Sequence, residues 1–312
     1  MISRRRILTI AAGCAASTLL PLRAQAENHA QELIQWRGVA LGADASITLA
    51  DHPRADAIIA DALAEISRLE AVFSLHDTNS ALVRLNRDSR LDAPPFELLE
   101  CLSLAGAVHD ATDGYFDPTI QPLWAMNAQR HGAGSLYDAS VEEQARGRVG
   151  WSGLSFDASS IQLAAGMQLT LNGIAQGYIA DQVAALLRSN GLTNILINTG
   201  EFYAQGGQPD GQPWPISLND GQQVHHEIVS LENRALASSA PRGITFDQAG
   251  QISHIIDPKS GQPVQSPWTL ISVLAPKAGL ADALSTAFCL MDAEQINASL
   301  QHFTDVKIVY AG

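Results

Sequence analysis

Two oxygen-bearing side chains lie four residues apart in the apolar stretch GLADALSTAFCLM, which runs from Gly279 to Met291. Its apolar positions recur at helical spacing, so Asp282 and Thr286 are expected one turn apart on the same face of a helix. A carboxylate and a hydroxyl placed in this way are the hard oxygen ligands that Mg²⁺ prefers. The same residues also fit a solvated stripe, or an acid that favours the helix dipole after Pro276. The other segments of the chain must decide between a cation site and a solvent-exposed face.

An aromatic pair beside an acid follows a predicted helix in the segment TDGYFDPTIQPL, residues 112–123. Gly114 ends the helix, and Tyr115, Phe116 and Asp117 come next. The two rings can stack on a planar ligand whose N–H groups the carboxylate accepts, or the acid can cap a turn. Either interpretation puts these residues in a loop on a rigid frame, where binding groups are common.

Two further segments put polar groups at predicted turns. In LNGIAQGY, residues 171–178, Gly173 lies at a strand-to-helix turn, where a glycine lets the backbone approach phosphate or metal. No Walker-type lysine or spaced glycine triplet accompanies it in the sequence. In SHIIDPKSGQP, residues 253–263, His254 precedes an ordered turn, so its ring is either a structural group or a base that the turn holds in place.

The predicted secondary structure mixes helices and strands without strict alternation. Helices are predicted at 54–73 and 94–114, and a strand with a glycine interruption at 36–50. Residues 167–200 have the pattern of a strand, a glycine turn, a helix and a second strand. Short alternating runs between 201 and 268 indicate an antiparallel sheet. The pattern predicts an α+β fold of one large domain or two closely joined subdomains.

The first residues have the form of a removable export signal. SRRRIL contains paired arginines, an apolar run follows, and AQA at residues 24–26 is a small-residue cleavage site. We predict a twin-arginine signal peptide over residues 1–26 and a mature chain of residues 27–312 in the periplasm, with no membrane span after cleavage. A lipoprotein site at Cys14 is the less favoured alternative.

The chain is acidic, with a formal net charge of −13 at pH 7, and the predicted signal contains arginines but no acid. Phosphate backbones and anionic lipid surfaces would repel such a mature chain, which argues against binding to nucleic acid or to a membrane surface. Cys101 and Cys289 remain after cleavage, and both lie in apolar helical patterns where buried thiols are common. We therefore expect two thiols, although an oxidising compartment permits a disulfide.

Five segments occur in the order seen in ApbE-type FAD:protein FMN transferases, and together they resemble that family over nearly all of the mature chain. These segments are RLEAVFSLHDTNSALVRLN, TDGYFDPT, LNGIAQGYIAD, HIIDPKSG and ADALSTA. The forms LNGIAQGY and NTGE look most like the NosX branch, which is associated with maturation of the nitrous oxide reduction system. The resemblance implies an ApbE-like mixture of helices and antiparallel sheet.

The resemblance also implies a reaction, in which Mg²⁺-dependent transfer moves FMN from FAD to a threonine of a partner flavoprotein and releases AMP. The acceptor threonine would lie in a Ser/Thr-Gly-Ala-Thr-like sequence, and a membrane-bound NosR-type protein is one candidate acceptor. Family matching makes Asp282, Thr286 and the carbonyl of Gly173 the metal ligands, with Asp282 catalytic, and makes His254 the base for the acceptor's proton. The implied contacts to FAD are Leu41, His76, Tyr115, Phe116, Asp117, Thr170, Gln176 and Ile256.

This chain departs from the family pattern at three positions. Thr170 stands where many members have Asp, Gln176 where many have Lys, and Glu201 where a second glycine is usual. Loss of a cation near phosphate would weaken FAD binding by about 1–3 kcal/mol. Three functions therefore stay open: an FMN transferase, a hydrolase that splits FAD into FMN and AMP, and a non-catalytic flavin-binding assembly factor.

Replacement of Arg4 and Arg5 by Lys should leave the precursor in the cytoplasm, because the twin-arginine route depends on the arginine pair and not on charge alone. Cell fractionation and immunoblotting measure the distribution. Arg23→Lys, which keeps the pair, is the control and should be exported normally. Normal export of the doubly substituted chain would show that the segment is not a twin-arginine signal.

Overall fold

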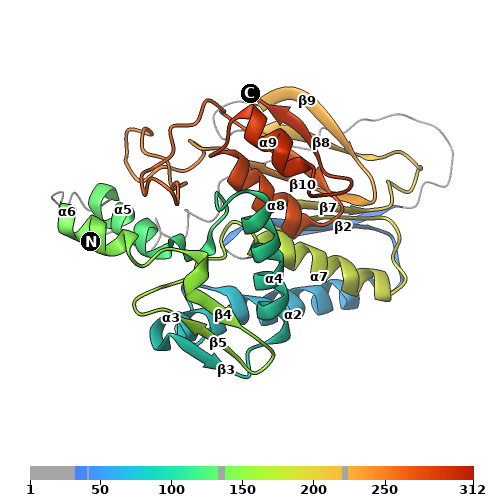
Figure 1. Cartoon of the computed structure of the whole chain (residues 1–312). Helices are drawn as coiled ribbons and strands as arrows, with labels where there is room; N and C mark the ends of the chain where they lie inside the picture. The colour runs from blue at the N-terminus through green and yellow to red at the C-terminus, as the bar shows by residue number, and fades with distance from the viewer. Residues whose placement is uncertain (1–31, 41, 133–137, 220–223) are drawn as a thin grey trace.

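The computed structural model describes residues 32–40, 42–132, 138–219 and 224–312 (Figure 1). The predicted signal peptide, residues 1–26, and the predicted FAD contact Leu41 lie outside the described residues. The helices are α2 (Ala55–Phe73), α3 (Ala81–Asp88), α4 (Phe96–Ala111), α5 (Gln121–Gly132), α6 (Ala139–Arg146), α7 (Ala175–Ser189), α8 (Ala278–Phe288) and α9 (Ala293–Leu300). The strands are β1 (Leu33–Ala40), β2 (Ala43–Ala50), β3 (Arg90–Asp92), β4 (Leu154–Phe156), β5 (Ser160–Leu163), β6 (Ile195–Asn198), β7 (Phe202–Gln205), β8 (Trp214–Asn219), β9 (Val224–Leu231), β10 (Arg234–Ser239), β11 (Ile271–Ala275) and β12 (Lys307–Ala311).

Seven strands form the main sheet in the order β1-β2-β6-β7-β10-β11-β12, and neighbouring strands pair antiparallel. Successive side chains of a strand face opposite sides of a sheet. In β10, Ala235 and Ala237 join the main apolar core, whereas Leu236 between them joins a second apolar cluster. That second cluster contains Trp214 and Ile216 of the β8-β9 hairpin, so the hairpin covers one face of the sheet.

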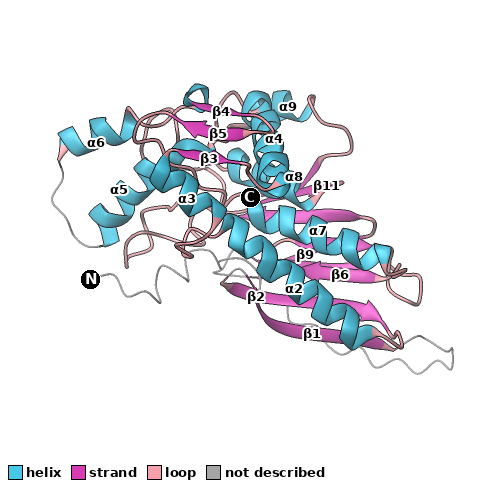
Figure 2. Cartoon of the chain, turned by 90° about the horizontal axis from the view of Figure 1, so that it is seen from below, coloured by secondary structure: helices cyan, strands magenta, loops and turns pink. Residues whose placement is uncertain are grey.

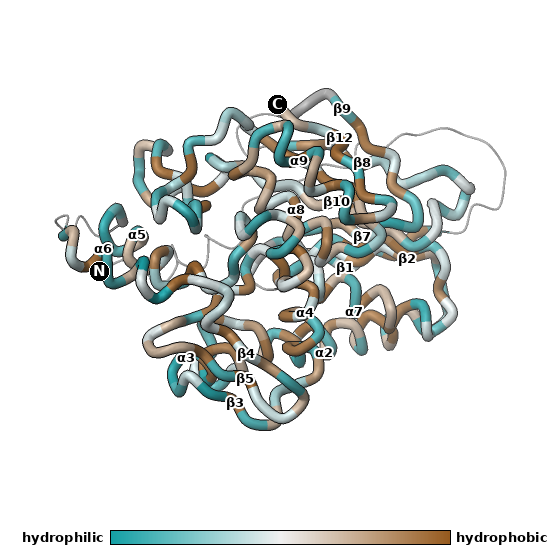
Figure 3. Tube along the Cα trace, in the orientation of Figure 1, coloured by the Kyte–Doolittle hydropathy of each residue, from teal (hydrophilic) through white to brown (hydrophobic). Residues whose placement is uncertain are grey.

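Helices α2, α7 and α8 cover the other face, where the main core lies (Figure 2). Helix α7 packs on β6 and β7, helix α8 packs on β10 and β11, and α4 contacts both α2 and α8. Figure 3 shows hydrophobic and hydrophilic stretches alternating along α2 and α7, as expected for helices with one buried face. A small sheet, β3-β5-β4, lies beside α3. The α+β fold class is therefore confirmed, as are the helices predicted at 54–73 and 94–114.

The strand predicted at 36–50 is a β-hairpin. Strands β1 and β2 pair from Leu33 opposite Ala50 to Ala40 opposite Ala43. Gly42 has a φ of 75° at the chain reversal, a left-handed conformation that glycine adopts at low cost. The glycine interruption seen in the sequence is thus a reversal of direction within one sheet.

Residues 167–171, which were predicted to form a strand, belong to no strand. The Asn86 side chain takes the place of a neighbouring strand, because its Nδ2 donates to Leu169 O at 2.8 Å and its Oδ1 accepts from Leu169 N at 2.7 Å. Next to it, Thr170 N donates to Pro118 O at 2.8 Å. Helix α3 and the loop after α4 therefore fix the segment that leads into α7.

The two cysteines of the described chain are buried thiols, as predicted. Burial raises the pKa of Cys101, which disfavours the reactive thiolate. Among the helices that the structure describes, none combines the length and apolarity needed to cross a membrane.

Helices α7 and α8 approach in direct backbone contact near their N-termini. A Cβ on Gly177 would meet the Ala278 carbonyl group and lie 2.7 Å from Gly279 N. A Cβ on Gly279 would lie 3.2 Å from Tyr178 N. Because the atoms on both sides belong to the backbone, two residues without side chains set the separation of the helices.

Gly177→Ala should lower the free energy of unfolding by about 3 kcal/mol, because the added methyl group meets backbone that cannot rotate away. Urea unfolding measures the change. Gly147→Ala is the matched control, since a Cβ there lies no closer than 3.5 Å to other atoms and the backbone φ is −64°. A Gly177→Ala protein as stable as the control variant would contradict the close crossing of α7 and α8.

Candidate functional site

Asp282 is buried on helix α8, with 4% of its surface exposed. The helix begins at Ala278 and has no acid in its first turn. The two alternative interpretations of Asp282, a solvated stripe and an acid at the helix dipole, are therefore wrong. Its Oδ2 instead accepts a hydrogen bond from Gly177 N of α7 at 3.3 Å.

Thr286 lies one turn after Asp282 and meets the turn that precedes α7. A Cβ on Gly173 would lie 3.0 Å from Thr286 Oγ1, so the backbone of this turn passes beside the hydroxyl. Ser239, at the end of β10, places another hydroxyl 3.5 Å from Thr286 Oγ1 and 2.8 Å from Ser285 Oγ. The fold thus brings α8 and the Gly173 turn together, although they are far apart in the sequence.

The groups at this meeting point fit a hard divalent cation. Asp282 offers a carboxylate, Thr286 a hydroxyl and Gly173 a backbone turn without a Cβ, and all three can supply oxygen ligands. Within the described residues, no three His, Cys, Asp or Glu side chains gather as a metal cluster. A site of this composition suits Mg²⁺, which keeps water or substrate oxygens in its coordination shell.

A second buried carboxylate, Glu201, belongs to the same region. Its exposed fraction is 8%, and its Oε2 accepts from Ser238 N at 3.2 Å. Burial and the nearby charge of Asp282 raise the pKa of Glu201 well above its ordinary value. Burial, with a contribution from Asp181, raises the pKa of Asp282 to about 7. Sequence reasoning noted Glu201 only as a departure from a pattern, and the usable signal was an acid directly before the apolar segment FYA, residues 202–204.

Gln176 packs over the turn between β6 and β7. Its side-chain amide nitrogen lies 3.0 Å from the position of a Cβ on Gly200, whose φ is 106°. Thr199 Oγ1 also donates to the Gln176 carbonyl at 3.3 Å. Gln176, at the start of α7, therefore contacts the NTGE turn, residues 198–201. This is the position where the resemblance leads us to expect a lysine.

The loop after α4 combines turn formation with core packing. Asp117 Oδ1 accepts from Thr119 N at 2.8 Å and from Thr119 Oγ1 at 2.7 Å, which confirms that this acid caps a turn. Phe116 has 5% of its surface exposed and packs in the main core. The Tyr115 hydroxyl accepts from Gln295 Nε2 at 3.2 Å, and Lys259 Nζ lies 3.9 Å from the Tyr115 ring centroid.

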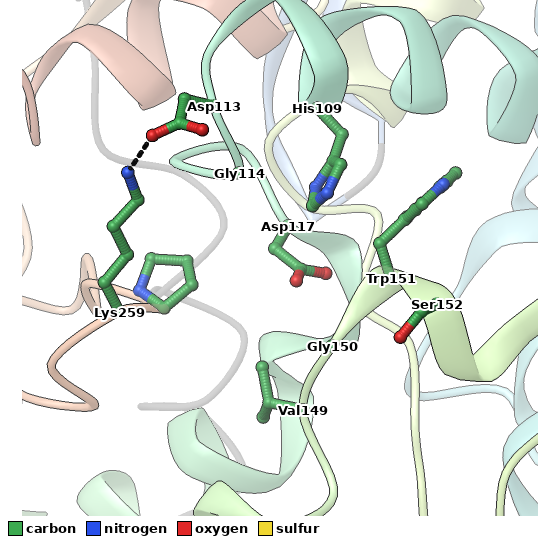
Figure 4. Close-up of a pocket in the computed structure, with 10 residues that line it drawn as sticks. His109, Asp113, Gly114, Asp117, Val149, Gly150, Trp151, Ser152 and Lys259 are labelled. Carbon is green, nitrogen blue, oxygen red and sulfur yellow. Dashed lines mark hydrogen bonds and ion pairs between the residues drawn. The ribbon is translucent and has the colours of Figure 1, made fainter.

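A cleft of about 420 Å³ opens beside this loop (Figure 4). It is lined by His109, Asp113, Gly114, Asp117, Val149, Gly150, Trp151, Ser152, Pro258 and Lys259. The His109 and Trp151 rings stack with centroids 5.2 Å apart, and Lys259 Nζ donates to Asp113 Oδ2 at 2.6 Å on the opposite side. Sequence reasoning missed His109 and Trp151, which belong to separate segments that only the fold unites.

The hydrogen-bond partner of His254 determines which of its ring nitrogens carries the proton. Nδ1 lies 2.9 Å from Ile244 O, and because a carbonyl oxygen only accepts, Nδ1 carries the proton. Nε2 is then left with its lone pair, and burial lowers the pKa of the ring, which favours the neutral form. Ile256, two residues later, is 5% exposed and packs in a small apolar cluster with Phe246 and Leu123.

The other two predicted FAD contacts, His76 and Thr170, differ in their surroundings. His76 is exposed in the turn after α2, where its N–H bonds to Ser74 Oγ at 3.0 Å. Thr170 is half-buried beside Pro118, so it joins the loop of Asp117 to the turn of Gly173. The structure therefore connects the segments that carry Asp117, Thr170, Gly173 and Thr286, and leaves His76 on the surface.

Asp282→Asn should stabilise the metal-free protein at pH 8 by about 1–3 kcal/mol, because the variant does not bury this charge. The pKa of about 7 lies above the ordinary value, so Asp282 holds its proton in the folded state up to that pH. The higher pKa in the folded state stabilises the protein at low pH, and this contribution is lost as the pH rises from about 4, the ordinary pKa, to about 7. Thermal unfolding in EDTA at pH 5 and pH 8 measures the difference, which should be small at pH 5. A wild type more stable than the variant at pH 8 would contradict the burial of an uncompensated charge.

Comparisons with known proteins agree in family and fold. The sequence model of the ApbE family matches residues 41–310. An FAD:protein FMN transferase of Haemophilus influenzae is 28% identical over 271 residues, covering 80% of this chain and 75% of that protein. The apo structure of the flavinyl transferase ApbE of Pseudomonas stutzeri has a TM-score of 0.75 at 26% identity and covers 88% of this chain and 89% of that one. The flavin transferase ApbE of Vibrio cholerae has a TM-score of 0.77 at 24% identity, over 90% of this chain and 97% of that one. The chain belongs to the ApbE family.

Proposed function

We propose that this chain transfers FMN from FAD to a threonine side chain of a partner protein and releases AMP. The observation that carries the proposal is the contact of Thr286 with the Gly173 turn, one helical turn from the buried Asp282, in a member of the ApbE family. Relatives at 23–28% identity bear the name FAD:protein FMN transferase. Ionised carboxylates in this region would repel a pyrophosphate, which supports a role for a cation in binding FAD.

Asp282, Thr286 and the Gly173 carbonyl would hold Mg²⁺. When bound, the ion neutralises charge that develops on the pyrophosphate oxygens as the bond to AMP breaks. The hydrogen bond from Gly177 N keeps the Asp282 carboxylate in one orientation. The contact with Ser239 does the same for the Thr286 hydroxyl, which reduces the reorganisation needed on binding.

His254 would act as the general base for the acceptor threonine. Its Nδ1 proton is held by Ile244 O, so Nε2 can accept the proton of the threonine hydroxyl. The threonine oxygen then bonds to the phosphorus of the FMN half, and the phosphorus–oxygen bond to AMP breaks. AMP leaves with the electron pair of that bond, and the proton stays on the His254 ring.

The flavin ring would occupy the cleft beside the loop of Asp117. Asp117 uses Oδ1 to cap its turn, and its carboxylate lies between His109 and the Val149–Gly150 segment in Figure 4. The carboxylate would accept a hydrogen bond from an N–H group of the flavin, and the Trp151 ring would provide an aromatic surface. Phe116 and Ile256 would support this cleft from the core.

The proposed setting is the periplasm, reached through the twin-arginine route, with a NosR-type flavoprotein as candidate acceptor. The paired arginines before an apolar run support the export route. The forms LNGIAQGY and NTGE support the NosX branch, and through it the acceptor.

Incubation of the mature chain with FAD and Mg²⁺, with and without an acceptor domain carrying a Ser/Thr-Gly-Ala-Thr-like sequence, tests the proposal. We expect flavin fluorescence on the acceptor band in a denaturing gel, and none when EDTA is added or the acceptor threonine is replaced by valine. Free FMN without labelled acceptor would establish the FAD pyrophosphatase instead. Intact FAD in both samples would establish a non-catalytic flavin-binding factor.

His254→Ala should retain FAD binding and reduce transfer by roughly 10²–10⁴-fold, because the ring is assigned to the proton of the acceptor and not to the dinucleotide. FAD titration and single-turnover labelling measure the two effects separately. His302→Ala is the matched control, an exposed histidine after α9 that should have no effect. Full activity of the His254 variant would remove this residue from the mechanism, and a parallel loss of FAD affinity would assign it to binding.

A further inference from the structure

An aspartate of each helix, α7 and α8, accepts hydrogen bonds from backbone N–H groups at the N-terminal end of the other helix. Asp181 of α7 accepts from Ala278 N at 2.7 Å and from Gly279 N at 3.0 Å, the first two residues of α8. In return, Asp282 of α8 accepts from Gly177 N in the first turn of α7 at 3.3 Å. Each acid comes four residues after the backbone group that the other acid contacts, in the related segments GYIAD and AGLAD.

Neither helix has a cap of its own. The residue before α7 is Ile174 and the residue before α8 is Lys277, and neither side chain makes a capping hydrogen bond. The first N–H groups of a helix have no partner within that helix, and a negative charge near them is favourable. Asp181 therefore accepts hydrogen bonds from the first N–H groups of α8, although it belongs to α7. An N-cap residue normally provides this acceptor from the same chain segment as the helix.

These reciprocal hydrogen bonds join the two helices that carry or follow the proposed ligands of the cation. Helix α8 carries Asp282 and Thr286, whereas Gly173 belongs to the turn that leads into α7. A displacement of α8 along its axis would separate Thr286 from the Gly173 turn, where the Thr286 side chain lies 3.0 Å from the position of a Cβ on Gly173. The contact of Gly177 with Ala278 sets the separation of the helices, and the two Asp181 bonds set the position of α8 along its axis.

We infer that Asp181 is a positioning residue of the cation site, which fixes α8 against α7 so that Asp282 and Thr286 meet the Gly173 turn. The inference rests on the proposed function for the identity of the site. Both carboxylate oxygens of Asp181 accept from backbone N–H groups at the start of α8, so the carboxylate is directed at the end of that helix. The inferred role acts through the helix that Asp181 holds, in addition to the effect of its charge on Asp282.

Asp181→Asn is the test variant, because it keeps the shape and one acceptor but removes the second acceptor and the charge. The first measurement is the Mg²⁺-induced rise in the thermal midpoint, with Mg²⁺ alone as the probe. We expect half-saturation at a Mg²⁺ concentration at least tenfold higher than in the wild type. Transfer at saturating Mg²⁺ should stay within about threefold of the wild type, since no reacting group is lost.

Asp157→Asn is the matched control for lost stability. Asp157 also accepts from two backbone N–H groups, Ser159 N at 2.7 Å and Ser160 N at 3.0 Å, but in the turn between β4 and β5 of the small sheet. It should lower the thermal midpoint without changing the Mg²⁺ half-saturation. Asp181→Glu keeps the charge and adds a methylene group that displaces the end of α8, so it too should raise the Mg²⁺ requirement.

Wild-type Mg²⁺ half-saturation in Asp181→Asn would overturn the inference, and so would an Asp181→Glu protein that behaves as the wild type, because the effect would then be one of charge. A wild type whose thermal midpoint does not respond to Mg²⁺ would overturn it as well. The proposed function is tested separately by acceptor labelling. If the acceptor is labelled but the variants have an unchanged Mg²⁺ requirement, the proposed function stands and the inference about Asp181 is wrong. If the Mg²⁺ response depends on Asp181 but no acceptor is labelled, the inference stands and the proposed function is wrong.

Discussion

The burial of negative charge where α7 meets α8 constrains the whole site. Asp282 and Glu201 are both almost fully covered, and none of the ion pairs among the described residues includes either of them. Backbone N–H groups are their hydrogen-bond donors, from Gly177 and Ser238. A buried carboxylate without a counter-charge is costly, so the fold holds these groups in a state that a divalent cation would relieve. The packing that buries these carboxylates is therefore also what would favour the proposed cation.

The same constraint explains how an acidic chain can bind a dinucleotide. Burial raises the pKa of Asp282 to about 7 and also raises the pKa of Glu201, so the fold disfavours the ionised carboxylates. A divalent cation held by Asp282 would offset the negative charge of the ionised carboxylate and so reduce its repulsion of phosphate. Gln176 packs on the turn at Gly200 and carries no positive charge, so a cation would have to supply more of the attraction for phosphate.

Much of this arrangement is predictable from the sequence, and the failures share a cause. Helical spacing correctly put Asp282 and Thr286 on one helix, because periodicity is a local property. Periodicity does not reveal what covers a face, so the sequence leaves a cation site and a solvent-exposed face as alternatives for Asp282 and does not predict its burial against α7. The strand expected at 167–171 is absent because Asn86, which is remote in sequence, occupies its hydrogen-bonding groups. The proximity of Glu201 to Asp282 and the cleft lined by His109 and Trp151 likewise depend on contacts between distant segments.

The most direct test of the account is the affinity of the wild-type protein for FAD, measured by flavin fluorescence across a series of Mg²⁺ concentrations that begins in EDTA. If Asp282, Thr286 and the Gly173 carbonyl hold Mg²⁺ as proposed, FAD should bind at least tenfold more tightly at saturating Mg²⁺. By reciprocity, saturating FAD should lower the Mg²⁺ half-saturation by the same factor. An FAD dissociation constant that is the same in EDTA and in saturating Mg²⁺ would contradict the account.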